Sequence, residues 1–344
     1  MRIRSLLVHA AFAAWIVSIY VTRADAQQFE SVGIRAQGMA GAFVAVADDA
    51  TATWWNPAGL AGGPYLDGLV EYGTLRQPEA PAPAGELRPA RQTRTRGFAF
   101  AYPAAGVSYY RLKISEIRPL GSTAPDGSDR DNPGGMARLR AFSVSQYGLT
   151  VGQSLGPHLV VGSTLKLVRG SVAAADVTAA DATFGRADEL DGDTDTHTDL
   201  DVGAMASFDH LRFGVTMRNV REPEFGPASD REQLLRRARA GVAVIARPNR
   251  GLDQLTVAAD VDLTEAETVL GEAKYVAAGA EVWLFGRRIG VRGGASRNLR
   301  GAQLLSPSGG LSLAFSNGAY LEGQYTAGRD RGRRGWGVDL RVTF

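Results

Sequence analysis

The chain has 344 residues, and its 38 Lys and Arg against 36 Asp and Glu leave a net charge of only +2 at neutral pH. A nucleic-acid-binding protein carries a basic excess, so this balance argues against that class of partner. The sequence holds no cysteine, which excludes a disulfide framework, a thiolate metal site and a lipid-modified cysteine.

The first 26 residues have the pattern of a secretory signal peptide. Arg2 and Arg4 precede an apolar run over residues 6–21, and Ala24-Asp25-Ala26 forms a small-residue cleavage site. We therefore expect cleavage before Gln27. An uncleaved membrane anchor is the alternative, although the run is shorter than the roughly 20 residues that a membrane-spanning helix needs.

The stretch from Gly33 to Leu60, GIRAQGMAGAFVAVADDATATWWNPAGL, is apolar but irregular. Its glycines interrupt any helical pattern, and Asn-Pro and Ala-Gly are turn signals. Because the polar groups of such a backbone need partners, the stretch requires an enclosing structure. We predict that residues 27–63 form an N-terminal plug. The alternative, a surface arm or linker, leaves two tryptophans exposed.

Short segments from Tyr65 onward alternate apolar and polar residues at period two, which predicts strands with two different faces. In one of them Leu211 and Phe213 alternate with Arg212 and Gly214. Fourteen candidate strands follow one another, at residues 65–76, 96–103, 106–115, 139–152, 158–169, 198–208, 210–220, 236–247, 253–263, 273–285, 287–297, 306–316, 318–327 and 334–344.

The connections between these strands are alternately long and short, which is typical of an antiparallel outer-membrane β-barrel. A soluble sandwich would scatter its loop lengths more evenly. We therefore predict an all-β fold in which residues 64–344 form a transmembrane barrel of the cell outer membrane, with both termini periplasmic. A barrel of this width is not filled by its own side chains, and residues 33–60 are the apolar segment left to plug it.

A family resemblance adds to this reading. The stretch from Gly33 through Asp48-Asp49 to Trp54-Trp55-Asn56-Pro57 resembles the N-terminal signature of FadL-type outer membrane transport proteins, and is most similar to their PorV and TraF-like group. The resemblance implies a fourteen-stranded barrel with an N-terminal plug. It also implies passage of hydrophobic molecules in the FadL branch, or partner and secretion roles in the PorV branch.

The last residue and the length of the chain add two further expectations. The last residue, Phe344, is similar to the C-terminal signal that the barrel assembly machinery reads, which makes that machinery an expected partner. The chain is shorter than typical FadL transporters and shows no long apolar loop helices that would collect a ligand outside. This departure argues against fatty-acid transport.

Two sets of candidate site residues follow from the plug and the barrel. Asp48 and Asp49 are expected to hold the plug to arginines of the lumen as a latch, or to cap and turn a short helix, and the two roles are compatible. The plug and gating residues are Gly38, Gly41, Asp48, Asp49, Trp54, Trp55, Asn56 and Pro57. The lumen-facing charges are Arg212, Arg218, Arg239, Asp260, Asp339 and Arg341.

An acidic run, DGDTDTHTDLD, offers a weak metal site at Asp191, Asp193 and Asp195. It departs from a calcium loop, because Thr196 stands where that loop has glycine and Val202 where it has glutamate. A solvated outer loop is the simpler interpretation. We expect no metal, no cofactor and no enzyme, since past the leader only His158, His197 and His210 remain and no G-x-S-x-G motif occurs.

A basic set is expected at the outer end, where it would contact lipopolysaccharide phosphates or remain solvated. It consists of Arg236, Arg237, Arg239, Arg329, Arg331, Arg333 and Arg334. The functional hypothesis is a passive conduit for small hydrophobic molecules, gated by the plug and independent of any energy source. The alternative is a PorV-like scaffold or shuttle that docks a secreted or partner protein without small-molecule transport. The lining of the lumen should discriminate between them.

Overall fold

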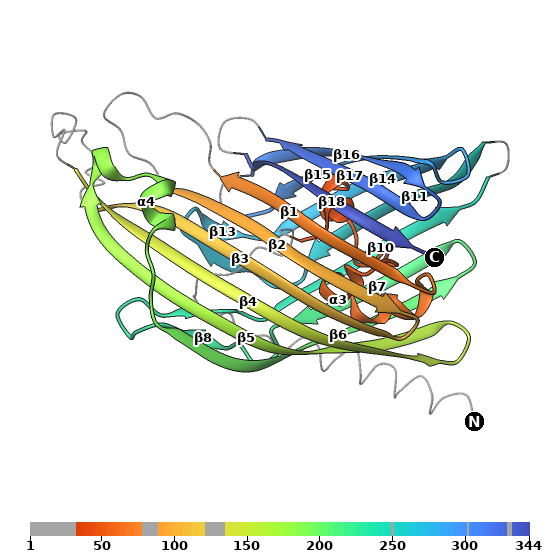
Figure 1. The fold of residues 1–344 in the computed structure, drawn as a ribbon, viewed down its shortest axis with the longest axis horizontal. Helices are drawn as coiled ribbons and strands as arrows, with labels where there is room; N and C mark the ends of the chain where they lie inside the picture. Colours follow the sequence, from red (N-terminus) through yellow and green to blue (C-terminus); the bar gives the residue numbers. More distant parts are fainter. Residues whose placement is uncertain (1–31, 78–88, 121–134, 249–250, 301–302, 329–331) are drawn as a thin grey trace.

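The computed structural model describes residues 32–77, 89–120, 135–248, 251–300, 303–328 and 332–344. Within these residues, fourteen antiparallel strands close into a barrel, and the first strand pairs with the last (Figure 1). The predicted fold class is confirmed. The predicted signal peptide lies outside the described residues.

The barrel strands follow the chain order around the wall. They are β1 (Asp67–Gln77), β2 (Ala90–Tyr102), β3 (Ala105–Leu120), β4 (Met136–Leu155), β5 (Leu159–Thr178), β6 (Thr194–Phe208), β7 (Leu211–Arg218), β10 (Arg237–Ala246), β11 (Leu252–Asp262), β14 (Tyr275–Leu284), β15 (Ile289–Asn298), β16 (Leu305–Ser316), β17 (Ala319–Ala327) and β18 (Arg334–Thr343). Each of these corresponds to one predicted strand.

Five neighbouring strands, β2–β6, are several residues longer than the sequence pattern predicts. β2 begins at Ala90 and β3 ends at Leu120, so both enter segments that we expected to be loops. β5 continues to Thr178, and β6 begins at Thr194 within the expected acidic loop. Hydrogen-bonded pairing with neighbouring strands continues there although outward residues such as Arg94 and Lys113 are charged, and an apolar alternation cannot reveal such extensions.

The barrel has an apolar outer face and a polar inner face, the arrangement of a barrel that is surrounded by lipid. On β18 the outward Val338 and Leu340 are 44% and 56% exposed, whereas the inward Asp339 and Arg341 are each 4% exposed. The same inversion recurs on β17, where Leu321 faces outward and Glu322 is buried. No helix of the described residues is long and apolar enough to cross a membrane.

The two ends of the barrel differ in their connections (Figure 1). At one end short turns join the strands, for example at residues 103–104, 209–210 and 317–318, and Phe344 pairs there with Leu66. The other end carries the long connections. These hold η3 (Ala179–Asp181), α4 (Phe184–Asp188) and the small two-stranded sheets β8 (Glu224–Phe225) with β9 (Glu232–Gln233) and β12 (Ala266–Thr268) with β13 (Gly271–Ala273).

The lipid-facing side of β18 gives a stability prediction. Val338→Arg places a charge near the middle of the outward apolar band, and we expect a loss of roughly 2–4 kcal/mol in the free energy of unfolding. Ala327→Arg, at the long-connection end of β17, should cost about 1 kcal/mol or less. Guanidinium unfolding of the protein in lipid vesicles measures both. Equal losses for the two variants would contradict the assignment of an apolar band.

Candidate functional site

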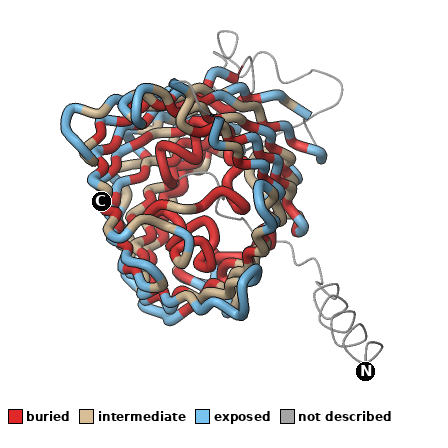
Figure 2. The backbone as a smooth tube through the Cα atoms, turned by 90° about the vertical axis from the view of Figure 1, so that its right-hand side faces the viewer, coloured by how far each residue is buried: buried red, intermediate tan, exposed pale blue. Residues whose placement is uncertain are grey.

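The interior of the barrel is occupied by residues 32–63, which we call the inner segment. It contains α2 (Ile34–Gly38), α3 (Ala52–Trp55) and η2 (Pro57–Gly62). From Val32 to Leu60 each residue is buried except Asp48, which is partly exposed. α2 packs against β15–β18 and η2 against β2–β6, so the segment bridges opposite walls, as the buried backbone inside the ring in Figure 2 shows.

Local sequence signals produce the irregular course of the inner segment. Ala40 and Gly41 both have positive φ, 58° and 86°, which ends α2 after little more than one turn. The Asn56 side chain accepts a hydrogen bond from the Ala58 N–H at 3.2 Å, which caps η2, and Pro57 occupies its first position. The carboxylate of Asp49 accepts from the Thr51 N–H at 2.9 Å, so Asp49 turns the chain into α3.

Arg35 is the ionic centre of the inner segment. Its guanidinium lies 2.5 Å from Asp48, 3.1 Å from Asp49 and 2.6 Å from Glu281 on β14. The side chain is only 3% exposed, so these bonds form away from solvent. We expected Asp48 and Asp49 to bind arginines of the barrel wall. The arginine that binds both belongs to their own segment, and the wall contributes a glutamate instead.

The Glu281 carboxylate starts a circuit of alternating charges along the inner wall. The successive pairs are Glu281–Arg292 (3.2 Å), Arg292–Glu322 (3.3 Å), Glu322–Arg341 (3.5 Å) and Arg341–Asp67 (2.9 Å). Asp67 then accepts a hydrogen bond from the Ala50 N–H at 2.8 Å, which returns the circuit to the inner segment. Because buried charges are costly unless paired, the segment and the wall neutralise each other.

The backbone of the inner segment is also held by wall side chains. Asp260 accepts hydrogen bonds from the N–H groups of Phe43 and Val44, at 2.9 and 2.8 Å. Arg239 donates to the Gly41 carbonyl at 3.2 Å and pairs with Asp262 at 2.8 Å. These contacts satisfy peptide groups that an irregular chain leaves without helix or sheet partners.

The two tryptophans of α3 have different environments. The Arg218 guanidinium lies over the Trp54 ring at 3.4 Å and is held by Asp201 at 3.3 Å. The indole N–H of Trp55 donates to the Val32 carbonyl at 3.0 Å. Trp54 is thus bound to the wall by a close cation–π contact, whereas Trp55 bonds within the segment and has the Arg239 guanidinium at 5.9 Å from its ring centroid.

The remaining predicted residues are dispersed. Arg212 lies on the inward face of β7, and Asp339 is buried on β18. Gly38 ends α2, where an added Cβ would lie 3.0 Å from the Arg292 side chain. Among the residues that the structure describes, no group of three His, Asp or Glu is placed to hold a metal ion. Asp195 of the acidic run instead accepts from the Gly226 N–H at 3.0 Å.

A set of inward glycines forms the seat of the inner segment, and the sequence analysis did not identify it. These glycines pair directly across neighbouring strands: Gly162 with Gly203, Gly214 with Gly241, and Gly279 with Gly294. At four of these positions an added Cβ would lie too close to the inner segment. The distances would be 2.4 Å from Pro57 at Gly162, 2.1 Å from Asn56 at Gly203, 2.5 Å from Val44 at Gly214 and 2.7 Å from Met39 at Gly294. The absence of side chains lets the segment's backbone lie against the wall.

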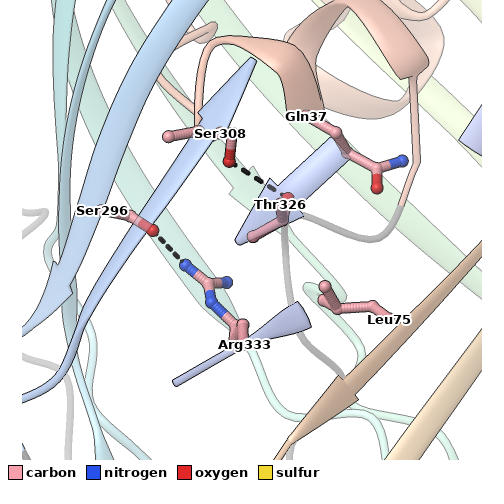
Figure 3. Close-up of a pocket in the computed structure, with 7 residues that line it drawn as sticks. Gln37, Leu75, Ser296, Ser308, Thr326 and Arg333 are labelled. Atoms are coloured by element: carbon pink, nitrogen blue, oxygen red, sulfur yellow. Dashed lines mark hydrogen bonds between the residues drawn. The ribbon is translucent and has the colours of Figure 1, made fainter. Parts of the chain in front are cut away.

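Little space remains between the inner segment and the wall at α2. A cavity of about 10 Å³ lies there, between Gln37, strands β1 and β15–β17, and Arg333 (Figure 3). This is the size of about one water molecule. Five of its seven lining residues are polar: Arg333 donates to Ser296, and the Ser308 and Thr326 hydroxyls lie 3.1 Å apart. The adjacent Gln324 side chain donates to Gln37 at 3.1 Å.

The adjacent glycines 293 and 294 test the seat. Gly294→Ala should destabilise the protein by about 1–3 kcal/mol, because the new methyl group would overlap Met39. Gly293→Ala should change little, because its Cβ would point outward and meet no atom nearer than Ser308, at 3.8 Å. Chemical unfolding followed by tryptophan fluorescence measures the difference. Equal effects would contradict the close approach.

The Arg35 contacts give a second prediction. Arg35→Ala leaves the buried carboxylate of Asp49 without its ion-pair partner and leaves Glu281 with Arg292 alone, and we expect a loss of about 3–5 kcal/mol. Arg186→Ala is the control, because Arg186 and Glu189 form an exposed pair at 3.8 Å that should contribute almost nothing. The midpoint of chemical unfolding and the protease resistance of residues 32–63 measure the effect. A stable Arg35 variant with a protected segment would contradict it.

Several solved structures are similar to this barrel. The toluene transporter TbuX of Ralstonia pickettii is similar, with a TM-score of 0.54 and 11% identity over 92% of this chain and 99% of that chain. A FadL homologue of Pseudomonas aeruginosa has a TM-score of 0.54 and 12% identity over 93% and 99%. A deletion mutant of the TodX monoaromatic hydrocarbon channel has a TM-score of 0.54 and 11% identity over 91% and 98%. At such identity the likeness shows the fold.

A search of curated proteins found no match. The model of the family described as "F plasmid transfer operon, TraF, protein" matches residues 83–262, which is more than half of the chain. The matched region begins after the inner segment and extends through β11, so it covers most of the wall that faces η2. The chain belongs to this TraF family and has the FadL-type outer-membrane barrel fold.

Proposed function

We propose that the protein is a gated outer-membrane conduit for small hydrophobic molecules and that the inner segment is its plug. In this scheme the end with short turns faces the periplasm. One observation carries the proposal. A single segment fills the barrel and is held to the wall by ion pairs, hydrogen bonds and glycine contacts. No cofactor or energy source takes part.

The contacts between the inner segment and the wall determine when the conduit opens. Because the described cavity beside α2 admits about one water molecule, a hydrophobic molecule passes only when the inner segment moves. Movement of α2 separates Arg35 from Glu281, and movement of residues 43–44 exposes the Asp260 carboxylate. Both changes remove hydrogen bonds from buried charged groups, so the closed state is favoured in the absence of a ligand.

The class of substrate is proposed from the relatives of the fold. TbuX is named a toluene transporter and TodX a monoaromatic hydrocarbon channel. Their barrels share the fold of this chain over nearly its whole length. We therefore choose toluene as the probe. Phe344, which is 67% exposed at the short-turn end, is proposed to be the signal for the assembly machinery.

A second candidate function is a scaffold that docks a secreted or partner protein. The polar lumen favours it, because buried Glu281, Arg292 and Asp262 offer no apolar lining to a hydrophobic ligand. The long-connection end is also ordered in part by ion pairs. Asp230 binds Arg138 at 2.6 Å, and this hydrogen bond lowers the pKa of the Asp230 carboxyl below its usual value.

A reversible tether tests the conduit. The protein has no natural cysteine, so Gln37→Cys with Gln324→Cys supplies the only two thiols. These side chains meet across the boundary between α2 and β17, and a short disulfide-forming linker would join them. In proteoliposomes the untethered variant should admit toluene. The linked protein should lose the flux and recover it after reduction.

The two single-cysteine variants, treated with the same linker, are the controls and should keep their flux. Flux that persists in the linked protein would show that the inner segment is not the gate. Absence of flux in every sample would overturn the conduit and favour the scaffold. The scaffold further predicts that a protein co-purifies with the chain under mild detergent.

A further inference from the structure

A square of four cations lies on the outward face of β2 and β3. In the strand register Arg94 stands opposite Lys113, and Arg96 stands opposite Arg111. The alternate residues Thr95 and Leu112 point to the lumen and are buried, so the four cations point away from it. None of the four was a candidate residue in the sequence analysis.

The upper pair of this square, nearer the long connections, binds an anion of the protein itself. Asp188, at the end of α4, forms an ion pair with Arg94, and its backbone carbonyl accepts from Lys113. The Asp188 carboxylate also accepts from the Ser115 hydroxyl at 2.6 Å. The outward face of these strands therefore binds an oxyanion where the chain supplies one.

The lower pair has no such anion. Among the described residues, no hydrogen bond or ion pair involves Arg96 or Arg111, and Arg96 is exposed. Like charges directly opposite on neighbouring strands destabilise a sheet unless something bridges them. A third cation, Arg169 on β5, is exposed and continues the row, because Ser145 pairs with both Arg111 and Arg169.

An apolar surface adjoins this row on the side of the short turns. Two positions from the row on each strand are four large side chains that pair with one another across β2–β5. They are Phe98, Tyr109, Tyr147 and Leu167. The ring centroids are 5.7 Å apart for Phe98 and Tyr109 and 4.9 Å apart for Tyr109 and Tyr147. Phe98, Tyr147 and Leu167 are each more than 40% exposed. Cations thus lie above an aromatic shelf.

We propose that this surface binds a phosphorylated lipid of the outer leaflet. The phosphate lies between Arg96 and Arg111, within reach of Arg169, and the acyl chains lie on the aromatic shelf. Guanidinium groups bind phosphate oxygens in pairs, and aromatic rings are enriched at the membrane interface. The cations stand on the side of the long connections, which is the outer-leaflet side in the proposed orientation. The proposal needs the outer-membrane location but not transport.

The arginines first expected to contact lipopolysaccharide have other roles. Arg237 and Arg239 are buried and bind Asp262, and Arg333 is buried against Ser296. Arg236 binds Glu222 at 3.2 Å, and Arg334 donates to the Gly328 carbonyl at 2.7 Å. Arg329 and Arg331 lie outside the described residues. The lipid contact is therefore assigned to a different face of the barrel.

The test is a binding titration of the refolded full chain in detergent, followed by native mass spectrometry. The probe is bis-phosphorylated lipid A, compared with dephosphorylated lipid A and inorganic phosphate. The double variant Arg96→Gln with Arg111→Gln should weaken lipid A binding at least about tenfold, because two charge-assisted contacts are lost. The control Arg297→Gln removes an exposed outward arginine of β15 and should leave binding unchanged.

Heat-modifiable migration on gels shows that each variant has formed its barrel before it is titrated. We expect dephosphorylated lipid A to bind the wild-type chain at least about tenfold more weakly than lipid A, and inorganic phosphate to bind negligibly. Lipid A binding by the double variant within twofold of wild type would overturn the proposal. So would equal binding of the dephosphorylated lipid, or binding of inorganic phosphate as tight as that of lipid A.

Discussion

The neutralisation of buried charge inside the barrel is the constraint on which the rest of the structure depends. A barrel of fourteen strands encloses more volume than its own side chains fill, and its inner face carries acidic and basic groups that need partners. The inner segment meets both needs, because Arg35 binds Glu281 and the N–H groups of residues 43–44 bind Asp260. The wall in turn removes side chains at its glycines so that the segment's backbone fits.

This mutual dependence explains why the segment is irregular. A long helix would satisfy its own peptide groups and leave the carboxylates of the wall without donors. Short elements such as α2 and η2 instead leave free N–H groups at their ends and between them. The aromatic rings of Phe43 and Trp55 pack against each other with their centroids 5.9 Å apart, so the segment also has a small core of its own.

The period-two pattern and the alternation of loop lengths were sufficient to predict the barrel, because lipid on one face and a lumen on the other impose opposite polarities. They could not predict the extension of β2–β6, where charged outward residues such as Arg94 and Lys113 interrupt the apolar alternation. The pairing of Arg35 with Asp48 and Asp49 was also missed, because the sequence marks both charges but not the turn at Ala40–Gly41 that folds the segment back. The glycine seat follows the inward period, yet only the strand register reveals that these glycines are neighbours.

The charge circuit has a consequence for how the barrel closes. Arg341 on β18 binds Asp67 on β1, two residues that are 274 positions apart in the chain. This bond crosses the line where the last strand meets the first, and Asp67 also holds Ala50 of the inner segment. The outward faces of β1 and β18 are both apolar, and a shift of two residues keeps them so. These faces therefore define the register of the two strands weakly. A slip by two residues would separate Arg341 from Asp67 and leave both charges buried. The segment that fills the barrel thus also shares in the contact that selects the alignment of its closing seam.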